Sequence, residues 1–520
     1  MKKLLISLFV FFSLLGVAAI FLNSYLKNQL QQIIKKDLPS SINLTYEDLN
    51  IDSWGGNASM KNATVSIKAN DSMPRSEVNN ATVTLKGLDH WDYFRNKNIH
   101  FKKITIHADS LSHYQQVKKE TKKPSKDSTN KNPIKAENIN GSFNIEEFEL
   151  VTNYIQIFKP KTKEILLKTA HFNLNLQNIT PTITETITRP FNYERISLSY
   201  DSLYYQINDF DELTVQNVHW DGSSLQMTNT LLKTAVSRTQ LSNSISIERD
   251  HVNLLIKKIT IDSLRYGERS GKFYINTPLI QLEEPSLNLY RDKLIADDLS
   301  TKPLYSKMLR DLKFDLMVNS LKIKNGSIIY TEKVNQGSES GSINFKNLQA
   351  NLTNVGNTYK ENEKKTKIAI KAIFMKQSPM TIDWEFDVQN KQDKFYLVGS
   401  LSKLPVTNLD GFTSPNLGVE MQGNIAHTYF TITGNDYNSH IDMQMTYDDF
   451  KVNILNQEKK KKKWLASTIA NIFISNTSKR EDKGFKEGSG DVTRNQNKSF
   501  FNYLWINLKD GMLKTVTALD

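Results

Sequence analysis

The sequence predicts a mainly β protein, in which an N-terminal transmembrane helix is followed by an elongated, curled antiparallel β-sheet of repeated strand units, with amphipathic helices at both ends. Three observations carry this prediction: an apolar run at residues 4–22, alternation of apolar and polar residues with period two from residue 42 to about residue 455, and a short unit that recurs five times in that region. The predicted order is a transmembrane anchor at 1–24, an amphipathic helix at 25–39, a repetitive β region at 40–456 with a flexible loop at 118–133, a basic amphipathic helix at 457–475, a polar loop at 476–498 and a C-terminal amphipathic helix at 499–520.

The N-terminal segment has the features of a membrane anchor. Lys2 and Lys3 precede residues 4–22, which contain nothing more polar than serine and are long enough for a spanning helix. The two lysines favour a cytoplasmic N-terminus, which places the bulk of the chain on the other side of the membrane. A cleaved signal peptide is the alternative, because residues 17–19 (VAA) would suit a signal peptidase. The apolar run continues past that point to Leu22, which favours a retained anchor.

The residues after the anchor predict an amphipathic helix. Leu26, Leu30, Ile33 and Leu38 recur at helical spacing, with lysines and glutamines between them. The pattern fits a helix that packs on the first strands and equally one that lies on a membrane surface.

Composition and charge exclude several classes of protein. With 38% hydrophobic residues the chain is too apolar to be disordered, and a mean hydropathy of -0.48 excludes a polytopic membrane protein. The absence of cysteine excludes disulfide scaffolds, thiolate metal sites and cysteine nucleophiles. The net charge is +12, but residues 118–135 and 459–463 carry +5 each, which leaves only +2 for the remainder. A nucleic-acid partner is therefore not expected, because no basic folded face is visible.

The β region repeats a strand, an Asp or Asn turn, and a strand with an aromatic residue. The five units start near residues 104, 148, 196, 259 and 321. Hairpin turns are predicted at Asp221-Gly222, Asn325-Gly326 and Asn435-Asp436. The region should contain roughly 20 to 25 strands, stacked along one direction rather than closed into separate domains.

One face of these strands is apolar and needs a partner. The face can form a filled core, which periodicity alone favours, or it can line a channel for apolar ligands such as lipid tails. The wall of such a lipid-binding channel would consist of Ile104, Ile106, Ile196, Leu198, Ile259, Ile261, Leu321 and Ile323.

Two amphipathic segments are predicted near the C-terminus. Lys459, Lys460, Lys461, Lys462 and Lys463 precede Trp464 and a helical apolar stripe. These residues form a solvated loop or, as the alternative, an interfacial helix whose lysines meet anionic headgroups. The last helix, capped by Ser499, either plugs the end of the sheet or contacts a membrane or partner.

No enzymatic motif is complete. Residues 267–272 (GERSGK) are one residue short of a phosphate-binding loop, and Phe273 stands where Ser or Thr would hold magnesium. The nine histidines are scattered, without a carboxylate pattern typical of a metal site. The sequence therefore predicts a protein that is not an enzyme and has no catalytic residue, cofactor or metal.

The last quarter of the chain carries a series of segments in a fixed order. They are LVGSL at 397–401, LPVTNL at 404–409, GVEMQGNI at 418–425, FTITGN at 430–435, MQMTYDDFKV at 443–452 and FFNYLW at 500–505, followed by Leu508, Gly511 and Leu513. Through these segments, and through the order of anchor, amphipathic helix and repeated strands, the chain resembles the AsmA-like family of envelope proteins. The resemblance is to its Bacteroidota-type branch especially, which is related to the bridge-like lipid transfer proteins with a repeating β-groove.

The resemblance implies a taco-shaped β-groove that is anchored in the inner membrane and extends into the periplasm. It implies a role in phospholipid transport between membranes or in outer-membrane homeostasis, with membrane phospholipids and other envelope proteins as partners. For the apolar face of the strands, the resemblance favours an open channel over a filled core. At 520 residues the chain is short beside the bridge-length members of that family. The alternative is a non-enzymatic scaffold or assembly factor for outer-membrane proteins, with a dry β core.

Overall fold

The computed structural model describes residues 38–52, 55–68, 75–96, 98–116, 143–160, 162–181, 191–337, 339–455, 477–478 and 484–517. The chain divides into two compact units, one with residues 1–209 and 213–227 and the other with 210–212 and 228–520. The described residues are mainly β and form 23 strands, which confirms the predicted mainly β class and the predicted strand number.

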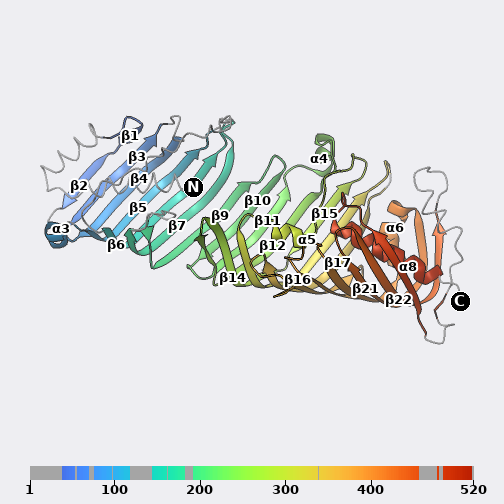
Figure 1. Ribbon diagram of the computed structural model, residues 1–520. Coiled ribbons are helices and arrows are strands. Elements are labelled where there is room, and N and C mark those ends of the chain that lie inside the picture. Colours follow the sequence, from blue (N-terminus) through green and yellow to red (C-terminus); the bar gives the residue numbers. More distant parts are fainter. Residues whose placement is uncertain are drawn as a thin grey trace, which may run out of the picture. The chain divides into compact units, whose positions relative to one another are not determined.

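The first unit contains strands that lie side by side in Figure 1. β3 pairs antiparallel with β1, β2 and β4, β4 with β5, β6 with β7, and β7 with β8 and β9. The strands are β1 (Ile42–Thr45), β2 (Asp48–Asp52), β3 (Asn57–Ile67), β4 (Arg75–Leu88), β5 (Ile99–Tyr114), β6 (Phe143–Phe158), β7 (Ile165–Pro181), β8 (Phe191–Asn192) and β9 (Arg195–Gln206). The division between the units falls within β10 (Asp211–Trp220) and β11 (Leu225–Thr234).

In the second unit each strand from β16 to β23 pairs antiparallel with the next. β12 pairs antiparallel with β14 and β15. The strands are β12 (His251–Asp262), β13 (Arg265–Arg269), β14 (Lys272–Glu283), β15 (Ser286–Asp292), β16 (Asp315–Lys333), β17 (Gly341–Gly356), β18 (Thr366–Phe374), β19 (Ser378–Phe386), β20 (Phe395–Pro405), β21 (Val419–Gly434), β22 (Asn438–Ile454) and β23 (Lys486–Thr493).

Helices in the described residues are few and lie between or after strands. They are α3 (His90–Asn96), α4 (Arg238–Ser244), α5 (Tyr305–Arg310), the 3-10 helix η1 (Val406–Leu409), α6 (Asp410–Leu417) and α8 (Phe500–Thr517). Ser237 caps α4, because its hydroxyl accepts from the Gln240 backbone while the Gln240 side chain accepts from the Ser237 backbone. α8 lies within the segment predicted as the C-terminal helix.

Three strand pairs are parallel, where an antiparallel sheet is predicted: β5 with β6, and β16 with both β14 and β15. A parallel pair needs a long crossover connection, since the second strand must start at the edge where the first began. The chain provides this length, with residues 115–142 between β5 and β6 and residues 293–314 between β15 and β16.

The recurring Asp or Asn turn lies inside a long strand in four of the five repeat units. β5, β6, β9 and β16 each run through it, so the two strands predicted there are one strand. Asn325-Gly326 accordingly forms a bend within β16, with φ of 54° at Asn325, and not a hairpin. In the fourth unit the turn is present, because β12 ends at Asp262 and β13 begins at Arg265. Asp221-Gly222 and Asn435-Asp436 also lie in turns.

The C-terminal segment differs from the prediction in one element. Residues 486–493 form β23 and pair with β22, where a polar loop at 476–498 is predicted. Alternating glycine and polar residues hide the strand from a hydrophobic pattern, and the glycines let α8 approach the backbone.

Several predicted segments lie outside the described residues: the anchor at 1–24, all of the helix at 25–39 except its last two residues, the loop at 118–133 and the basic helix at 457–475. Within the part of the chain that the structure describes, no helix has both the length and the hydrophobicity needed to cross a membrane.

Candidate apolar binding face

The predicted wall residues of the first unit lie next to one another across neighbouring strands. Ile104 on β5 is paired through β6 and β7 with Ile196 on β9, and Ile106 is paired in the same way with Leu198. The two lines are Leu85, Ile104, Phe148, Leu176 and Ile196, and Val83, Ile106, Leu150, Leu174 and Leu198. Together they form the apolar row of the first unit.

The second unit has a longer row of the same kind. Ile259 and Ile261 on β12 are in register through β14 with Ile323 and Leu321 on β16. The row continues to β22 through two lines of residues: Ile259, Leu282, Ile323, Ala350, Ile370, Ile382, Gly399, Phe430 and Met443, and Ile261, Ile280, Leu321, Leu352, Ile368, Trp384, Leu397, Ile432 and Ile441. Nine strands at their usual spacing give this row a length of about 38 Å.

The opposite face of the same strands is polar. Thr105 lies between Ile104 and Ile106 in sequence and therefore points to the other side of the sheet. Its line in the first unit is Thr84, Thr105, Glu149, Asn175 and Ser197, and the corresponding line in the second is Thr260, Gln281, Lys322, Asn351, Ala369, Asp383, Val398, Thr431 and Asp442. Each unit thus has one apolar and one largely polar face.

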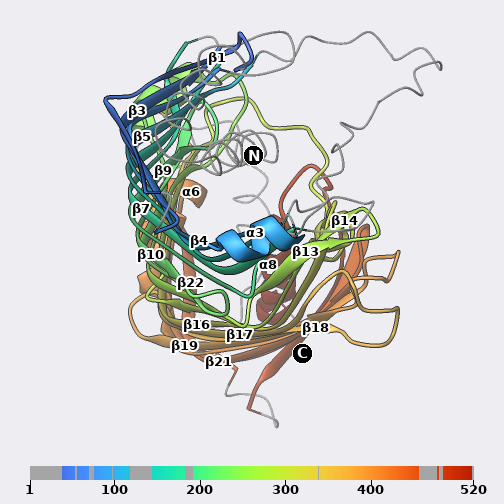
Figure 2. The ribbon, with the colours of Figure 1, turned by 90° about the vertical axis from the view of Figure 1, so that its left-hand side faces the viewer.

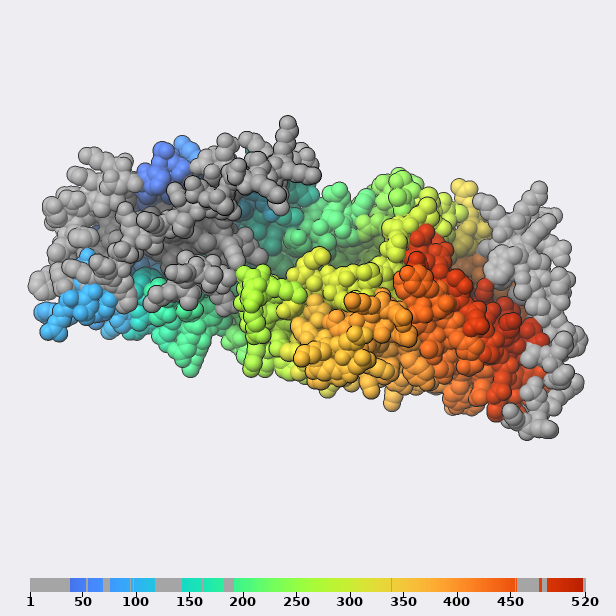
Figure 3. All heavy atoms as spheres, in the orientation of Figure 1, coloured from blue at the N-terminus to red at the C-terminus, as the bar shows by residue number. Residues whose placement is uncertain are grey.

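The apolar row of the second unit lies on the concave side of the sheet. α8 packs on this side, because a side chain on Gly511 would lie 3.0 Å from Ile441 and 3.2 Å from Met443. Figure 2 shows α8 inside the curve of these strands, and Figure 3 shows the same helix, in red, over the last strands. Concave, mostly apolar surfaces are where small apolar ligands commonly bind.

Burial along the rows is uneven. Ile104 and Ile106 are buried, at 7% and 1% exposure, in a cluster with Phe101, Ile145 and Leu176. Ile259 is at the border of burial, with 9% exposure. The other five predicted wall residues, namely Ile196, Leu198, Ile261, Leu321 and Ile323, are only half-buried. The row of the second unit is therefore incompletely covered between β12 and β18.

The far end of the second row is covered by aromatic packing. The ring of Phe500 on α8 stacks on Trp384 at 4.5 Å and meets Phe395 edge-on at 5.4 Å. Leu397, Ile432 and Ile441 beneath this layer are buried. The half-covered part of the row therefore ends at β19.

Residues of this row on β14 and β17–β19 were not among the sequence-predicted wall residues. They carry the same period-two signal, as in Ile280-Gln281-Leu282, but lack the Asp or Asn turn by which the repeat is recognised. The register of the strands, which the sequence does not contain, brings them together.

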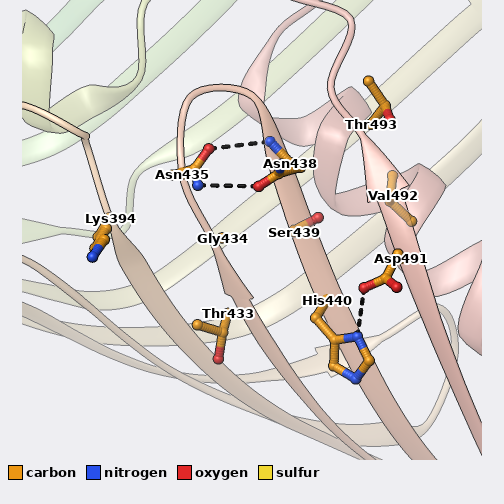
Figure 4. A pocket seen from close by; sticks show the side chains of 10 residues that line it. All are labelled: Lys394, Thr433, Gly434, Asn435, Asn438, Ser439, His440, Asp491, Val492 and Thr493. Atoms are coloured by element: carbon orange, nitrogen blue, oxygen red, sulfur yellow. Dashed lines mark hydrogen bonds and ion pairs between the residues drawn. The ribbon is translucent and has the colours of Figure 1, made fainter.

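A separate polar depression of about 500 Å³ lies where β21, β22 and β23 meet (Figure 4). The Nδ1 atom of His440 lies 2.7 Å from an Asp491 carboxylate oxygen. This contact, together with one to Asp442, raises the pKa of His440. The depression is lined by Lys394, Thr433, Gly434, Asn435, Asn438, Ser439, His440, Asp491, Val492 and Thr493. Most of these lining residues are polar or charged.

The incomplete phosphate-loop motif has a structural role. Residues 267–272 form the hairpin between β13 and β14, with positive φ at Ser270 and Gly271. A phosphate loop requires a strand, a loop and a helix, which this hairpin does not provide. Across the described ranges, no cluster of His, Asp or Glu is arranged to hold a metal ion.

Fold and site together define a mainly β protein whose two units each present an apolar face built from long strands. No family model matches the chain, and no curated protein is significantly similar to it. The predicted membrane-surface residues, Lys459, Lys460, Lys461, Lys462, Lys463 and Trp464, lie outside the described residues.

Proposed function

We propose that the protein binds lipid acyl chains on its apolar rows and contributes to phospholipid transport between membranes or to outer-membrane homeostasis. In this proposal it is an AsmA-like protein with a taco-shaped groove, anchored in the inner membrane by a single N-terminal helix with its N-terminus in the cytoplasm and its bulk in the periplasm. Membrane phospholipids are the ligands, other envelope proteins are the expected partners, and no enzymatic step is involved.

The observation that carries the proposal is the half-covered row between β12 and β18. Ile261, Leu321 and Ile323 keep solvent contact on a concave face, whereas a finished core would bury them. One leaflet of a bilayer contributes about 15 Å of acyl chain, which is half of the hydrocarbon thickness, and the half-covered part of the row, from β12 to β18, is about 19 Å long. Each methylene placed on it contributes roughly 0.8 kcal/mol of transfer free energy.

The second candidate is a scaffold or assembly factor with a dry core, and burial in the first unit favours it. Ile106 is 1% exposed and packs among other buried side chains. A filled core is the ordinary environment of such a residue.

Photocrosslinking in cells separates the two candidates. A photoreactive amino acid is placed at Ile261 or Ile323 on the apolar face, and at Thr260 on the polar face as the control. Mass spectrometry then identifies lipid adducts. Phospholipid adducts at the apolar positions and none at Thr260 would support the groove, while a folded protein without adducts at any apolar position would favour the scaffold.

A further inference from the structure

The connection between β15 and β16, residues 293–314, crosses the concave face of the second unit. We call it the strap. β15 and β16 are parallel, so the connecting chain must return from the carboxyl end of β15 to the end of the sheet at which β16 starts. It passes on the apolar side, because Leu304 is buried with Phe386 and Phe395.

The strap covers the apolar row at β19. The ring of Tyr305 meets Trp384 edge-on at 5.6 Å and Phe500 at 6.0 Å. Trp384 lies in the row between Ile368 on β18, which is half-buried, and Leu397 on β20, which is buried. The strap therefore marks the boundary between the half-covered and the covered part of the row.

Polar contacts fix the strap to the turn between β19 and β20. Arg310 donates to the Val388 carbonyl at 2.6 Å and pairs with Asp393 at 2.9 Å. The Ser306 hydroxyl donates to the same Asp393 carboxylate at 2.7 Å. Asp393 is buried, so these bonds replace its hydration. We call this group the strap clasp.

A second set of contacts joins the strap to the segment before α8. The Lys302 backbone N–H donates to the Gln496 carbonyl at 2.8 Å, and Arg494 donates to the Lys302 carbonyl. Lys498 pairs with Asp297 at 2.8 Å. The strap is thus held by these polar contacts together with the apolar contacts of Leu304, Tyr305 and Leu309.

α8 is attached differently. A side chain on Gly488 would come within 2.4 Å of the Thr515 backbone nitrogen, so helix and strand backbones are in direct contact. Such packing cannot be released by breaking ion pairs. The strap, by contrast, exposes Leu299 and Met308, and its buried end is anchored by the clasp and by the packing of Leu304.

We propose that the strap is a gate on the apolar row of the second unit. With the clasp closed, acyl chains occupy the row from β12 to β18, and with the clasp released they reach the edge of Trp384 that Tyr305 covers. The inference rests on the proposed lipid function. It adds the position on the row, at β19, beyond which a bound acyl chain does not extend.

The test uses the purified full chain with phosphatidylethanolamine–phosphatidylglycerol vesicles and p-benzoylphenylalanine. The photoprobe replaces Phe345, which packs in the half-covered part with Ile323, or Trp384, which lies under the strap. The release variant combines Arg310→Gln with Asp393→Asn, so that no buried charge is left unpaired. The matched control combines Lys307→Gln with Asp311→Asn. Lys307 on α5 and Asp311, the C-cap of that helix, form an exposed pair at 2.9 Å that does not join the strap to the sheet.

We expect lipid adducts at Phe345 in every variant and few at Trp384 in the parent and the control. The release variant should raise the yield at Trp384 about tenfold, because a minor open state of a few per cent becomes dominant. Equal yields at Phe345 and Trp384 in the parent would overturn the gate, as would a folded release variant that labels Trp384 no more than the control. Absence of adducts at Phe345 in every variant would instead contradict the lipid function itself.

A disulfide lock tests the gate while leaving the clasp residues unchanged. The chain contains no cysteine, so Lys302→Cys with Gln496→Cys introduces a single pair between adjacent backbones. Oxidation should abolish the residual labelling at Trp384, and reduction should restore it. Residual labelling that survives full oxidation would contradict a gate at the strap.

Discussion

Asn80 on β4 donates a hydrogen bond from Nδ2 to the Oδ2 atom of Asp109 on β5, over 2.6 Å, at the point where the ladder between the two strands is interrupted. Asn80 has a φ of 50°. The same arrangement recurs between β7 and β9, where His171, with a φ of 49°, lies 2.8 Å from Asp201. A line of polar residues thus marks a bend across the strands of the first unit.

The bend predicts how Asn80 responds to substitution. Asn80→Ala should lower the free energy of unfolding of the first unit by about 1–2 kcal/mol, because a Cβ without a local hydrogen bond is disfavoured in the left-handed region. Asn80→Gly loses the same hydrogen bond but keeps the backbone conformation, so it should cost less. Urea unfolding of the two variants measures the difference. An alanine variant at least as stable as the glycine variant would show that the backbone conformation is not the determinant.

The bend also shows what the sequence could and could not predict. The Asp and Asn residues of the repeat are regular enough to be recognised, and at Asp109 and Asp201 they lie opposite the positive-φ residues. A turn between two strands and a bend inside one strand use the same residue types, since both require a left-handed backbone. Local sequence therefore gives the position of the feature but not whether the chain reverses there.

For the candidate site, the sequence predicts on which face of a strand a residue lies, but not how far that face is covered. Period two assigns Ile104, Ile259 and Ile323 to the apolar side of their strands, and the structure places all three in apolar rows. How far the row of the second unit is covered depends on the strap and α8, which are distant in sequence from β12. β23 escaped recognition because only Val492 among its inward positions is hydrophobic, the others being Lys486, Gly488 and Gly490.

The contact of α8 with β23 predicts that adding one methyl group at Gly488 lowers the stability of the docked helix. Gly488→Ala should destabilise the docked helix by about 1–3 kcal/mol, because the new Cβ would lie 2.4 Å from a backbone nitrogen that cannot move alone. Hydrogen exchange of the α8 amides reports the undocking. Gly411→Ala in α6 is the control, since no atom lies within 4 Å of the new Cβ. Equal exchange in the two variants would contradict direct backbone packing.

Two histidines should have pKa values on opposite sides of the ordinary histidine pKa of 6.5. Contact with the Asp491 carboxylate raises the pKa of His440, and burial lowers the pKa of His113. The stabilisation from His440 is full below pH 6.5 and is lost as the pH rises through its raised pKa. For His113 the pH dependence of stability is opposite. Stability is full above pH 6.5 and falls as the pH drops toward the lowered pKa, because the unfolded state takes up the proton first.

NMR titration of the histidine ring protons checks this prediction. Asp491→Asn should lower the midpoint of His440 and leave that of His113 unchanged, because only His440 contacts Asp491. Coincident midpoints in the parent protein would refute the assigned contacts. The contribution of His440 to stability should be small and should weaken with salt, since its ring and its partners are exposed.

A charge on the half-covered row distinguishes a groove from a core. If Ile261 lines a groove, Ile261→Asp should cost little stability, because water can reach the carboxylate, but it should abolish lipid adducts from a photoprobe at Ile323. Thr260→Asp, on the polar face, should change neither quantity. In a dry core Ile261→Asp would instead destabilise the protein by several kcal/mol, the cost of burying an unpaired charge.

Ile106→Asp is the reference for an aspartate in a closed core. Ile106 is 1% exposed, so an aspartate there should be strongly destabilising whether Ile261 lines a groove or a core. Thermal unfolding of the three variants is measured beside the adduct yield. If Ile261→Asp destabilises as much as Ile106→Asp, the row at β12 is a closed core and lipid cannot lie on it. If Ile261→Asp unfolds at nearly the parent temperature and lipid adducts disappear, the lost adducts reflect a blocked surface, because the fold that presents the surface is intact.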